Sequence, residues 1–380
     1  MKKNLLATSA LVAVGALASH GALAQAKPIE LQVGGYMQQW FGFATFDGAP
    51  GQDDVSDVDQ QSDAEIHFTG SSTMDNGLTF GVNVQLEAET FGDQIDEAYL
   101  FVRGSFGEIL LGSENGAGYA MHYGFGNGAY GASLNTGDLE AWFPVDSAYE
   151  LSGTYQGFRN RDNDSNKVRW VSPRISGFQI GADFSPEGDQ DSDAFPTEIN
   201  NVGTPEQVWS VAVNYDNTFG DFRLRGSAGY QGIGDANNAQ AENDGQVYGF
   251  GLRVGFGGFE VGGSYTHEDD VAQRISGGPG GAAVFVENRD VVGGSVTYAS
   301  GPLGVKLAGA YGWQKYTNNP GNAITTDTEQ LSFELGTQYI LGPGVAARGS
   351  VYYAEQDDVN GVAGDDRSGV AVVGGISLSF

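Results

Sequence analysis

Apolar and polar residues alternate with a period of two in one segment of this chain after another, and this alternation limits the fold more than any other feature. Residues 78–88 place Leu, Phe, Val and Ala on one side, with Thr, Asn, Gln and Glu on the other. The same alternation recurs in residues 222–230, 250–256 and 331–339. Successive side chains of a β-strand point to opposite faces, so each segment is predicted to be a strand with one apolar and one polar face.

Short turns and longer loops separate these segments in strict succession. Each turn carries Gly or Pro, as hairpin geometry requires, and they lie at residues 75–77, 105–107, 175–177, 218–220, 256–258, 300–302 and 341–344. The longer loops lie near residues 47–60, 91–93, 114–165, 187–205, 232–245, 268–288, 316–327 and 356–367. These turns and loops connect sixteen predicted strands, and no linker interrupts the series.

A soluble sandwich would also alternate, but two further features favour a barrel in lipid. Connections alternate between very short and long, as in transmembrane barrels. Aromatic residues recur near the predicted strand ends, as in the girdles at the two membrane interfaces: Trp40, Phe41, Tyr99, Trp170, Trp209, Tyr215, Tyr298, Tyr311 and Tyr339. Because every backbone group must be paired in hydrocarbon, the sheet must close. We therefore predict an all-β fold, a 16-stranded antiparallel transmembrane β-barrel with a polar, water-filled interior.

The last nine residues, VVGGISLSF, read as the closing strand of this barrel. Ile376, Leu378 and Phe380 form its apolar face. A hydrophobic edge strand invites aggregation unless it is paired, so we expect it to pair with residues 31–46.

The start of the chain has the features of a secretory signal. Lys2 and Lys3 precede an apolar run too short to span a bilayer, and Ala22-Leu23-Ala24 offers a cleavage site. We expect residues 1–24 to be removed and residues 25–380 to form a single barrel domain.

Composition excludes several classes of protein. Without the two N-terminal lysines the chain has 16 Lys and Arg against 48 Asp and Glu, which argues against a nucleic-acid partner. It has no Cys, so it is not a disulfide scaffold. Beyond the signal, no run approaches the ~20 apolar residues of a transmembrane helix.

Four stretches, in their order, resemble the trimeric general porins of Gram-negative bacteria, and most of all those of alphaproteobacteria. They are DNGLTFGVNVQLE (75–87), DEAYLFVRGSFGEILLGSENGA (96–117), NKVRWVSPRISGFQIGADFSP (166–186) and the terminal ISLSF. The resemblance implies a homotrimer in the outer membrane, with the third loop folded inward as a constriction. It also implies that Ile376, Leu378 and Phe380 act as a signal to the assembly machinery. The second loop, near residues 91–93, is shorter than the latching loop of some porins.

The third loop, residues 114–165, is the candidate constriction. It is far longer than ordinary connections, and its many aromatic residues favour packing into the pore over solvation. Its acidic residues predict the narrowest point at Asp138, Glu140, Asp146 and Glu150.

The opposite wall is expected to carry positive charge on inward strand positions. The candidates are Lys167, Arg169, Arg223, Arg225, Arg253, Lys306 and Arg348, with acidic wall residues at Glu65, Glu87 and Glu89. Opposed charges would create a transverse field that sorts permeants. Alternatively, several of these side chains only solvate the lumen. Since the acidic residues dominate, we expect a moderately cation-selective pore for small hydrophilic solutes.

Acidic loops offer weak sites for Ca²⁺ or Mg²⁺ that would bridge to lipopolysaccharide; the alternative is that they are only solvated. These loops are residues 47–60 and 187–206. Residues 162–166 begin like an EF-hand loop, but Lys167 and Pro173 stand where that motif needs Gly and Glu. No cofactor is otherwise expected.

Enzyme readings find little support, because His67, His122 and His267 have no metal-ligand spacing and no GxSxG or P-loop occurs. Asp63, Glu65 and His67 share one strand face, which in a barrel lines the lumen. A spatially assembled Ser–His pair stays open from sequence alone. Two other functions also stay open: a substrate-specific channel with a binding track, and a non-conducting structural or adhesive barrel.

Overall fold

The computed structural model describes thirteen stretches of the chain. They are residues 28–47, 54–88, 95–125, 130–132, 142, 158, 161–188, 206–234, 245–269, 274–275, 284–317, 326–359 and 362–380. The predicted signal, residues 1–24, lies outside them.

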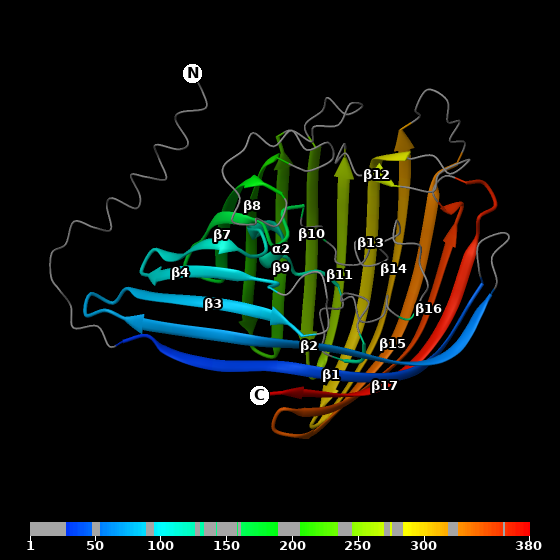
Figure 1. Ribbon diagram of the computed structural model, residues 1–380, viewed down its shortest axis with the longest axis horizontal. Helices are drawn as coiled ribbons and strands as arrows, with labels where there is room; N and C mark the ends of the chain where they lie inside the picture. Colours follow the sequence, from blue (N-terminus) through cyan, green and yellow to red (C-terminus); the bar gives the residue numbers. More distant parts are fainter. Residues whose placement is uncertain are drawn as a thin grey trace.

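One antiparallel sheet contains all the described strands (Figure 1). Sixteen of its strands have six or more residues, as the sequence predicts, and β12 (Arg274–Ile275) has two. The first eight long strands are β1 (Glu30–Phe46), β2 (Val55–Thr73), β3 (Thr79–Glu87), β4 (Ala98–Gly104), β5 (Gly107–Ser113), β6 (Asn166–Val171), β7 (Phe178–Glu187) and β8 (Glu206–Phe219). The others are β9 (Phe222–Ile233), β10 (Gly245–Phe256), β11 (Phe259–Asp269), β13 (Val284–Ser300), β14 (Leu303–Thr317), β15 (Thr328–Gly342), β16 (Val345–Asp357) and β17 (Arg367–Ser379).

The sheet closes where β1 meets β17. The two strands pair antiparallel from Tyr36 opposite Ser379 to Phe46 opposite Gly369. Beyond the last pair of the ladder, the Gly35 amide donates to the Phe380 carbonyl (3.0 Å), and the Phe380 amide donates to the Gly35 carbonyl (3.1 Å). The predicted partner of the terminal strand is therefore confirmed, and closure removes the exposed edge.

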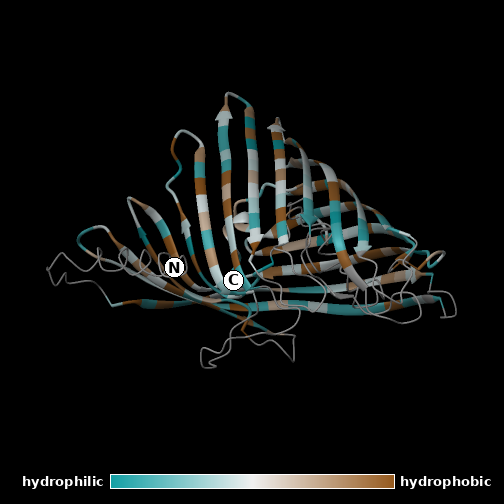
Figure 2. Cartoon of the chain, turned by 90° about the horizontal axis from the view of Figure 1, so that it is seen from above, coloured by the Kyte–Doolittle hydropathy of each residue, from teal (hydrophilic) through white to brown (hydrophobic). Residues whose placement is uncertain are grey.

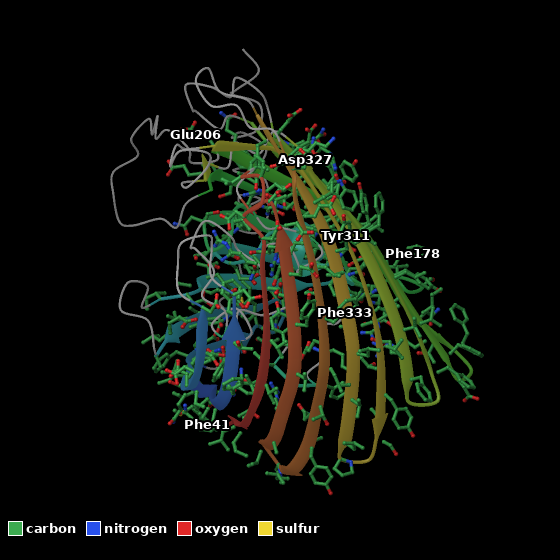
Figure 3. The ribbon with its side chains drawn as sticks, turned by 90° about the vertical axis from the view of Figure 1, so that its right-hand side faces the viewer. Phe41, Phe178, Glu206, Tyr311, Asp327 and Phe333 are labelled. Atoms are coloured by element: carbon green, nitrogen blue, oxygen red, sulfur yellow. The ribbon has the colours of Figure 1, made fainter. Side chains whose placement is uncertain are left out.

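The two faces of the strands differ as their alternation predicts, and Figure 2 shows hydrophobic and hydrophilic bands alternating along each strand. On β10, Leu252 is 55% exposed and its neighbour Arg253 only 5%, because Leu252 points outward and Arg253 inward. Phe178 and Phe333 on the outer face are also exposed (Figure 3). The barrel is thus inverted relative to a soluble protein, with its apolar side chains outside and its polar contacts inside.

All seven predicted turns join the expected strands, whereas three loop boundaries were wrong. Strand β2 begins at Val55 and β13 at Val284, so both loops are shorter than residues 47–60 and 268–288. Strand β3 ends at Glu87 and β4 begins at Ala98, so the second connection is longer than the predicted residues 91–93. Alternation alone does not reveal where a polar strand end becomes a loop.

Two aromatic residues assigned to the interface girdles lie elsewhere. Trp40 is buried on the inward face of β1, and Tyr99 lines an inward cleft with Asn83 on β3. Both residues occupy inward positions of their strands, as their polar neighbours do. The assignment to the girdles considered only their place near a predicted strand end. In the described residues no helix is long and apolar enough to cross a membrane.

Candidate pore lining

The connection between β5 and β6 follows the inner wall of the barrel, in the parts that the structure describes. It begins with the short helix α2 (Ala117–Ala120). Four backbone amides donate to inward-facing serines on four strands: Gly118 to Ser210 Oγ (2.8 Å), Tyr123 to Ser227 Oγ (2.8 Å), Phe125 to Ser264 Oγ (3.3 Å) and Ala132 to Ser350 Oγ (2.8 Å). We call these four residues the serine track; they satisfy loop amides that would otherwise be buried without partners.

Inward glycines make room for the aromatic residues of the same segment. Phe125 is fully buried, and a Cβ added to Gly293 on β13 would lie 1.9 Å from its ring. Tyr130 stands against Gly304 on β14 in the same way, at 2.0 Å. No side chain larger than hydrogen fits at these two wall positions while the rings stay in place.

Two predicted wall cations anchor this segment. The buried Lys167 ammonium donates to the carbonyl oxygens of Glu114, Asp162 (2.7 Å) and Ser165 (2.8 Å), and lies 3.7 Å from the Asp162 carboxylate. Arg169 pairs with Glu114 and donates to the Asn115 carbonyl (2.6 Å). The stretch that begins like an EF-hand loop therefore surrounds a lysine side chain.

Arg253 and Lys306 are also buried rather than open to the lumen. Arg253 Nε donates to the Gly124 carbonyl (2.6 Å), and its Nη1 lies 3.6 Å from Glu260. Lys306 pairs with Glu334 (2.9 Å), which accepts from Ser350 of the serine track. This differs from a ring of solvated charges, because four of the seven predicted cations are buried and three of these four contact the loop.

The remaining predicted cations lie on the inward face nearer the turns. Arg223 makes two hydrogen bonds to Asp216 (2.9 and 2.7 Å), and Arg225 pairs with Glu260. Arg348 donates to Gln38 on β1 (3.1 Å).

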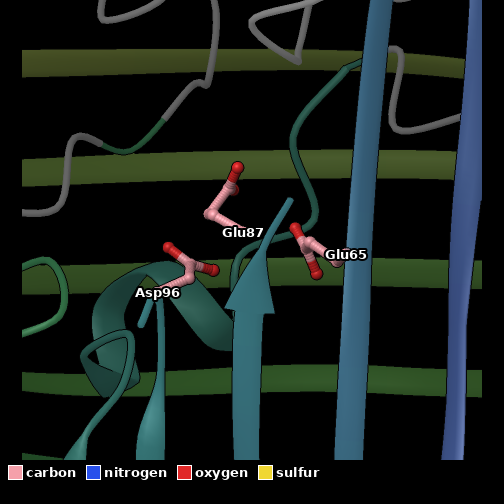
Figure 4. A group of neighbouring side chains, drawn as sticks. All are labelled: Glu65, Glu87 and Asp96. Carbon is pink, nitrogen blue, oxygen red and sulfur yellow. The ribbon is translucent and has the colours of Figure 1, made fainter. Parts of the chain in front are cut away.

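Glu65 on β2 and Glu87 on β3 lie beside Asp96 (Figure 4). Oxygen atoms of the three carboxylates lie within 4.8 Å of one another. Tyr36 donates to Glu65 (2.7 Å), and His67 lies 2.7 Å from the same carboxylate. The cluster brings together residues that the sequence placed separately.

Five predicted site residues fall outside the described residues. They are Glu89 and the four predicted constriction acids, Asp138, Glu140, Asp146 and Glu150.

His122 is a buried loop residue that sequence analysis placed in no site. Its Nδ1 lies 3.3 Å from Ser227 Oγ. Burial, together with the nearby Arg253 charge, lowers the pKa of His122 to about 4. The imidazole is therefore neutral at pH 7.

The serine track was also missed, although a signal for it exists. Inward strand positions of a wide barrel should carry large polar residues where they meet water. The run of Ser and Gly at such positions on β8, β9, β11, β13, β14 and β16 marks where backbone or rings approach closely.

The comparisons with known proteins agree with this architecture. The family model described as Gram-negative porin matches residues 7–359. The chain belongs to the Gram-negative porin family. It is an outer-membrane porin channel that works passively and is not an enzyme.

Solved structures show the same fold at low identity. The anion-selective porin from Comamonas acidovorans is 15% identical, with a TM-score of 0.55 over 92% of this chain and 100% of that one. A porin refined at 1.8 Å resolution is 19% identical, with a TM-score of 0.54 over 92% and 100%. The outer-membrane expressed OmpT of Vibrio cholerae is 14% identical, with a TM-score of 0.55 over 93% and 98%. No curated protein matches the sequence.

Proposed function

We propose that this porin is a moderately cation-selective channel for small hydrophilic solutes and ions. The observation that carries the proposal is the excess of inward carboxylates. On β2 alone, Asp57, Asp59, Asp63 and Glu65 alternate with outward residues, and no Lys or Arg of this strand shares their face. Cations therefore concentrate in the lumen and anions are partly excluded.

An open lumen is supported by a polar cleft of about 950 Å³ along β1 to β4. Its lining includes Gln32, His67, Asn83 and Arg103. Water fills such a space, which argues against the plugged structural barrel. The third-loop acids Asp138, Glu140, Asp146 and Glu150 stay our proposal for the narrowest point.

The test is the zero-current potential in a planar bilayer under a tenfold KCl gradient. We expect a potential that favours K⁺ over Cl⁻. An anion-favouring potential would contradict the selectivity, and stable folded protein without any conductance would contradict the channel. Conductance that saturates with a single solute would favour the substrate-specific channel instead.

The functional unit in this proposal is a homotrimer. Tyr and Trp prefer the membrane interfaces, and outward Tyr or Trp occurs on every long strand from β8 to β16. Within the described residues, the outward positions of β17 and β1 to β5 carry neither. Further copies of the chain, rather than lipid, cover this sector, which we call the aromatic-poor sector.

Three other contacts complete the proposal. Ile376, Leu378 and Phe380 face outward and are exposed, as a signal read by the assembly machinery must be. Lipid covers the aromatic strands. Outward carboxylates at the loop end, such as Glu329 beside Tyr311 (2.6 Å), hold Ca²⁺ or Mg²⁺ weakly and bridge to lipopolysaccharide phosphates. A chelator should then lower lipopolysaccharide binding; unchanged binding would contradict this contact.

A further inference from the structure

Basic residues gather on the inward face at the turn end of the barrel. Within three residues of the turn end of a described long strand, seven inward basic residues stand against four acidic ones. The basic residues are Arg103, Arg169, Arg223, Arg225, Arg253, Lys306 and Arg348. The acidic ones are Glu30, Glu108, Asp216 and Glu260.

The rest of the inward strand face has the opposite sign. Its acidic residues include Asp57, Asp59, Asp63, Glu65, Glu87, Asp183, Glu268 and Glu334. Its basic residues, in the described long strands, are Lys167, Arg289 and Arg367. The charges are thus sorted along the barrel axis and not only across it.

Ion pairs reduce this separation without removing it. Arg223–Asp216, Arg225–Glu260 and Arg103–Glu108 lie within the turn-end zone, which keeps more basic than acidic residues. The Arg103 and Arg223 side chains are 57% and 52% exposed, so their charges reach lumenal water. The pairs that cross between zones, Arg169–Glu114 and Lys306–Glu334, both place the positive charge nearer the turns.

We propose that the lumen is electrically bipolar along its axis, acidic toward the loops and basic toward the turns, and that ionic current through it therefore rectifies. The inference rests on the proposed channel function. Cations collect in the acidic zone and anions in the basic zone. A field from loops to turns drives both ions toward the middle of the pore and raises the conductance. The opposite field draws both outward and depletes the middle.

Salt concentration sets how well the zones act separately. A 12-residue strand such as β10 extends about 40 Å, at ~3.3 Å per residue. The Debye length is about 10 Å at 0.1 M salt and about 3 Å at 1 M. Rectification should therefore be clear at 0.1 M and weak at 1 M.

The experiment records the current in symmetric KCl at two opposite applied voltages, about +100 and −100 mV. The chain has no Cys, so Asp327→Cys at the exposed loop end gives a unique marker of orientation (Figure 3). A thiol-reactive polyethylene glycol too large to permeate labels only the loop side. We expect the current to be larger with the loop side positive, by about 1.5-fold or more at 0.1 M, and the ratio to approach one at 1 M.

Variants identify the charges responsible. Arg223→Gln, alone and with Arg103→Gln, should bring the ratio at 0.1 M closer to one. Lys315→Gln removes the same charge from the outward face of β14 and should leave the ratio unchanged. Three results would overturn this inference but not the proposed function. They are symmetric currents in the unaltered channel, a larger current with the loop side negative, and arginine variants whose current ratio equals that of the unaltered channel. Absence of any conducting channel would overturn the proposed function, and the inference with it.

Discussion

At the scale of single residues, Gly293 and Gly294 make a matched pair, because the first faces the loop and the second faces outward. A Cβ on Gly293 would collide with the Phe125 ring, whereas one on Gly294 meets nothing closer than 3.6 Å. We expect Gly293→Val to destabilise the barrel by about 1–3 kcal/mol through overpacking, and to alter single-channel conductance. Gly294→Val should do neither. Urea unfolding and bilayer recordings measure both effects, and equal behaviour of the two variants would contradict the packing of Phe125.

His122 gives a prediction about pH. Its pKa is about 4 in the folded protein, against an ordinary value near 6.5. Since the folded pKa of this base is depressed, its contribution to stability is full above pH 6.5. It is lost as the pH falls toward 4, because only the unfolded chain takes up the proton. The loss is on the order of 3 kcal/mol.

His122→Asn tests this sign, because the variant keeps a polar partner for Ser227 but cannot titrate. Urea unfolding at pH 7 and at pH 4.5 gives the free energy of unfolding of both proteins. The decrease on acidification should be smaller in the variant than in the unaltered protein. An equal decrease in both would mean that carboxylates alone account for the acid sensitivity.

At the scale of elements, the serine track fastens one loop to strands that are far apart in sequence. Ser227→Ala with Ser264→Ala leaves the half-buried Tyr123 amide and the buried Phe125 amide without their acceptors, at about 1–3 kcal/mol each. We expect lower stability and noisier open-channel current, as the segment leaves the wall. Ser332→Ala is the control, since Ser332 is inward and fully buried but its hydroxyl has no hydrogen-bond partner among the described residues. Quiet currents in the double variant would contradict the tethering role.

The elements themselves could be predicted from sequence because each depends on local chemistry. Alternation fixes which face of a strand is apolar, and Gly or Pro fixes the turns, so the strands and the closure between β1 and β17 followed. The contacts between the loop and the barrel wall could not be predicted from the sequence. Whether Lys167 faces water or three loop carbonyls depends on a segment that ends just before it in sequence but folds across several strands.

Charge placement illustrates the same limit. Inward parity correctly put Arg223, Arg225 and Arg253 on one face, because parity is a property of each strand. Their common height near the turns follows only when strands are aligned in the closed sheet. Parity alone therefore predicted an electric field across the lumen. The alignment of the strands adds the field along the barrel axis that we propose.

At the scale of the whole molecule, the aromatic-poor sector predicts where copies of the chain meet. Gly374 on β17 lies inside this sector, and Gly226 on β9 lies outside it. Both face outward, and a Cβ at either meets nothing closer than 3.7 Å, so the monomer tolerates a larger residue at each. A tryptophan at Gly374 would instead fill space that a neighbouring copy occupies, whereas at Gly226 it would lie among lipid-facing aromatics.

We therefore expect Gly374→Trp to lower the trimer fraction in mild detergent and Gly226→Trp to leave it unchanged. Light scattering on the purified proteins gives the mass, and heat-modifiability on gels shows that each variant still forms a barrel. Loss of trimer in Gly226→Trp alone would place the interface on the aromatic strands, and monomeric unaltered protein would remove the trimer from the proposal. Because each copy has its own closed lumen, a monomeric Gly374→Trp barrel should still conduct and still rectify.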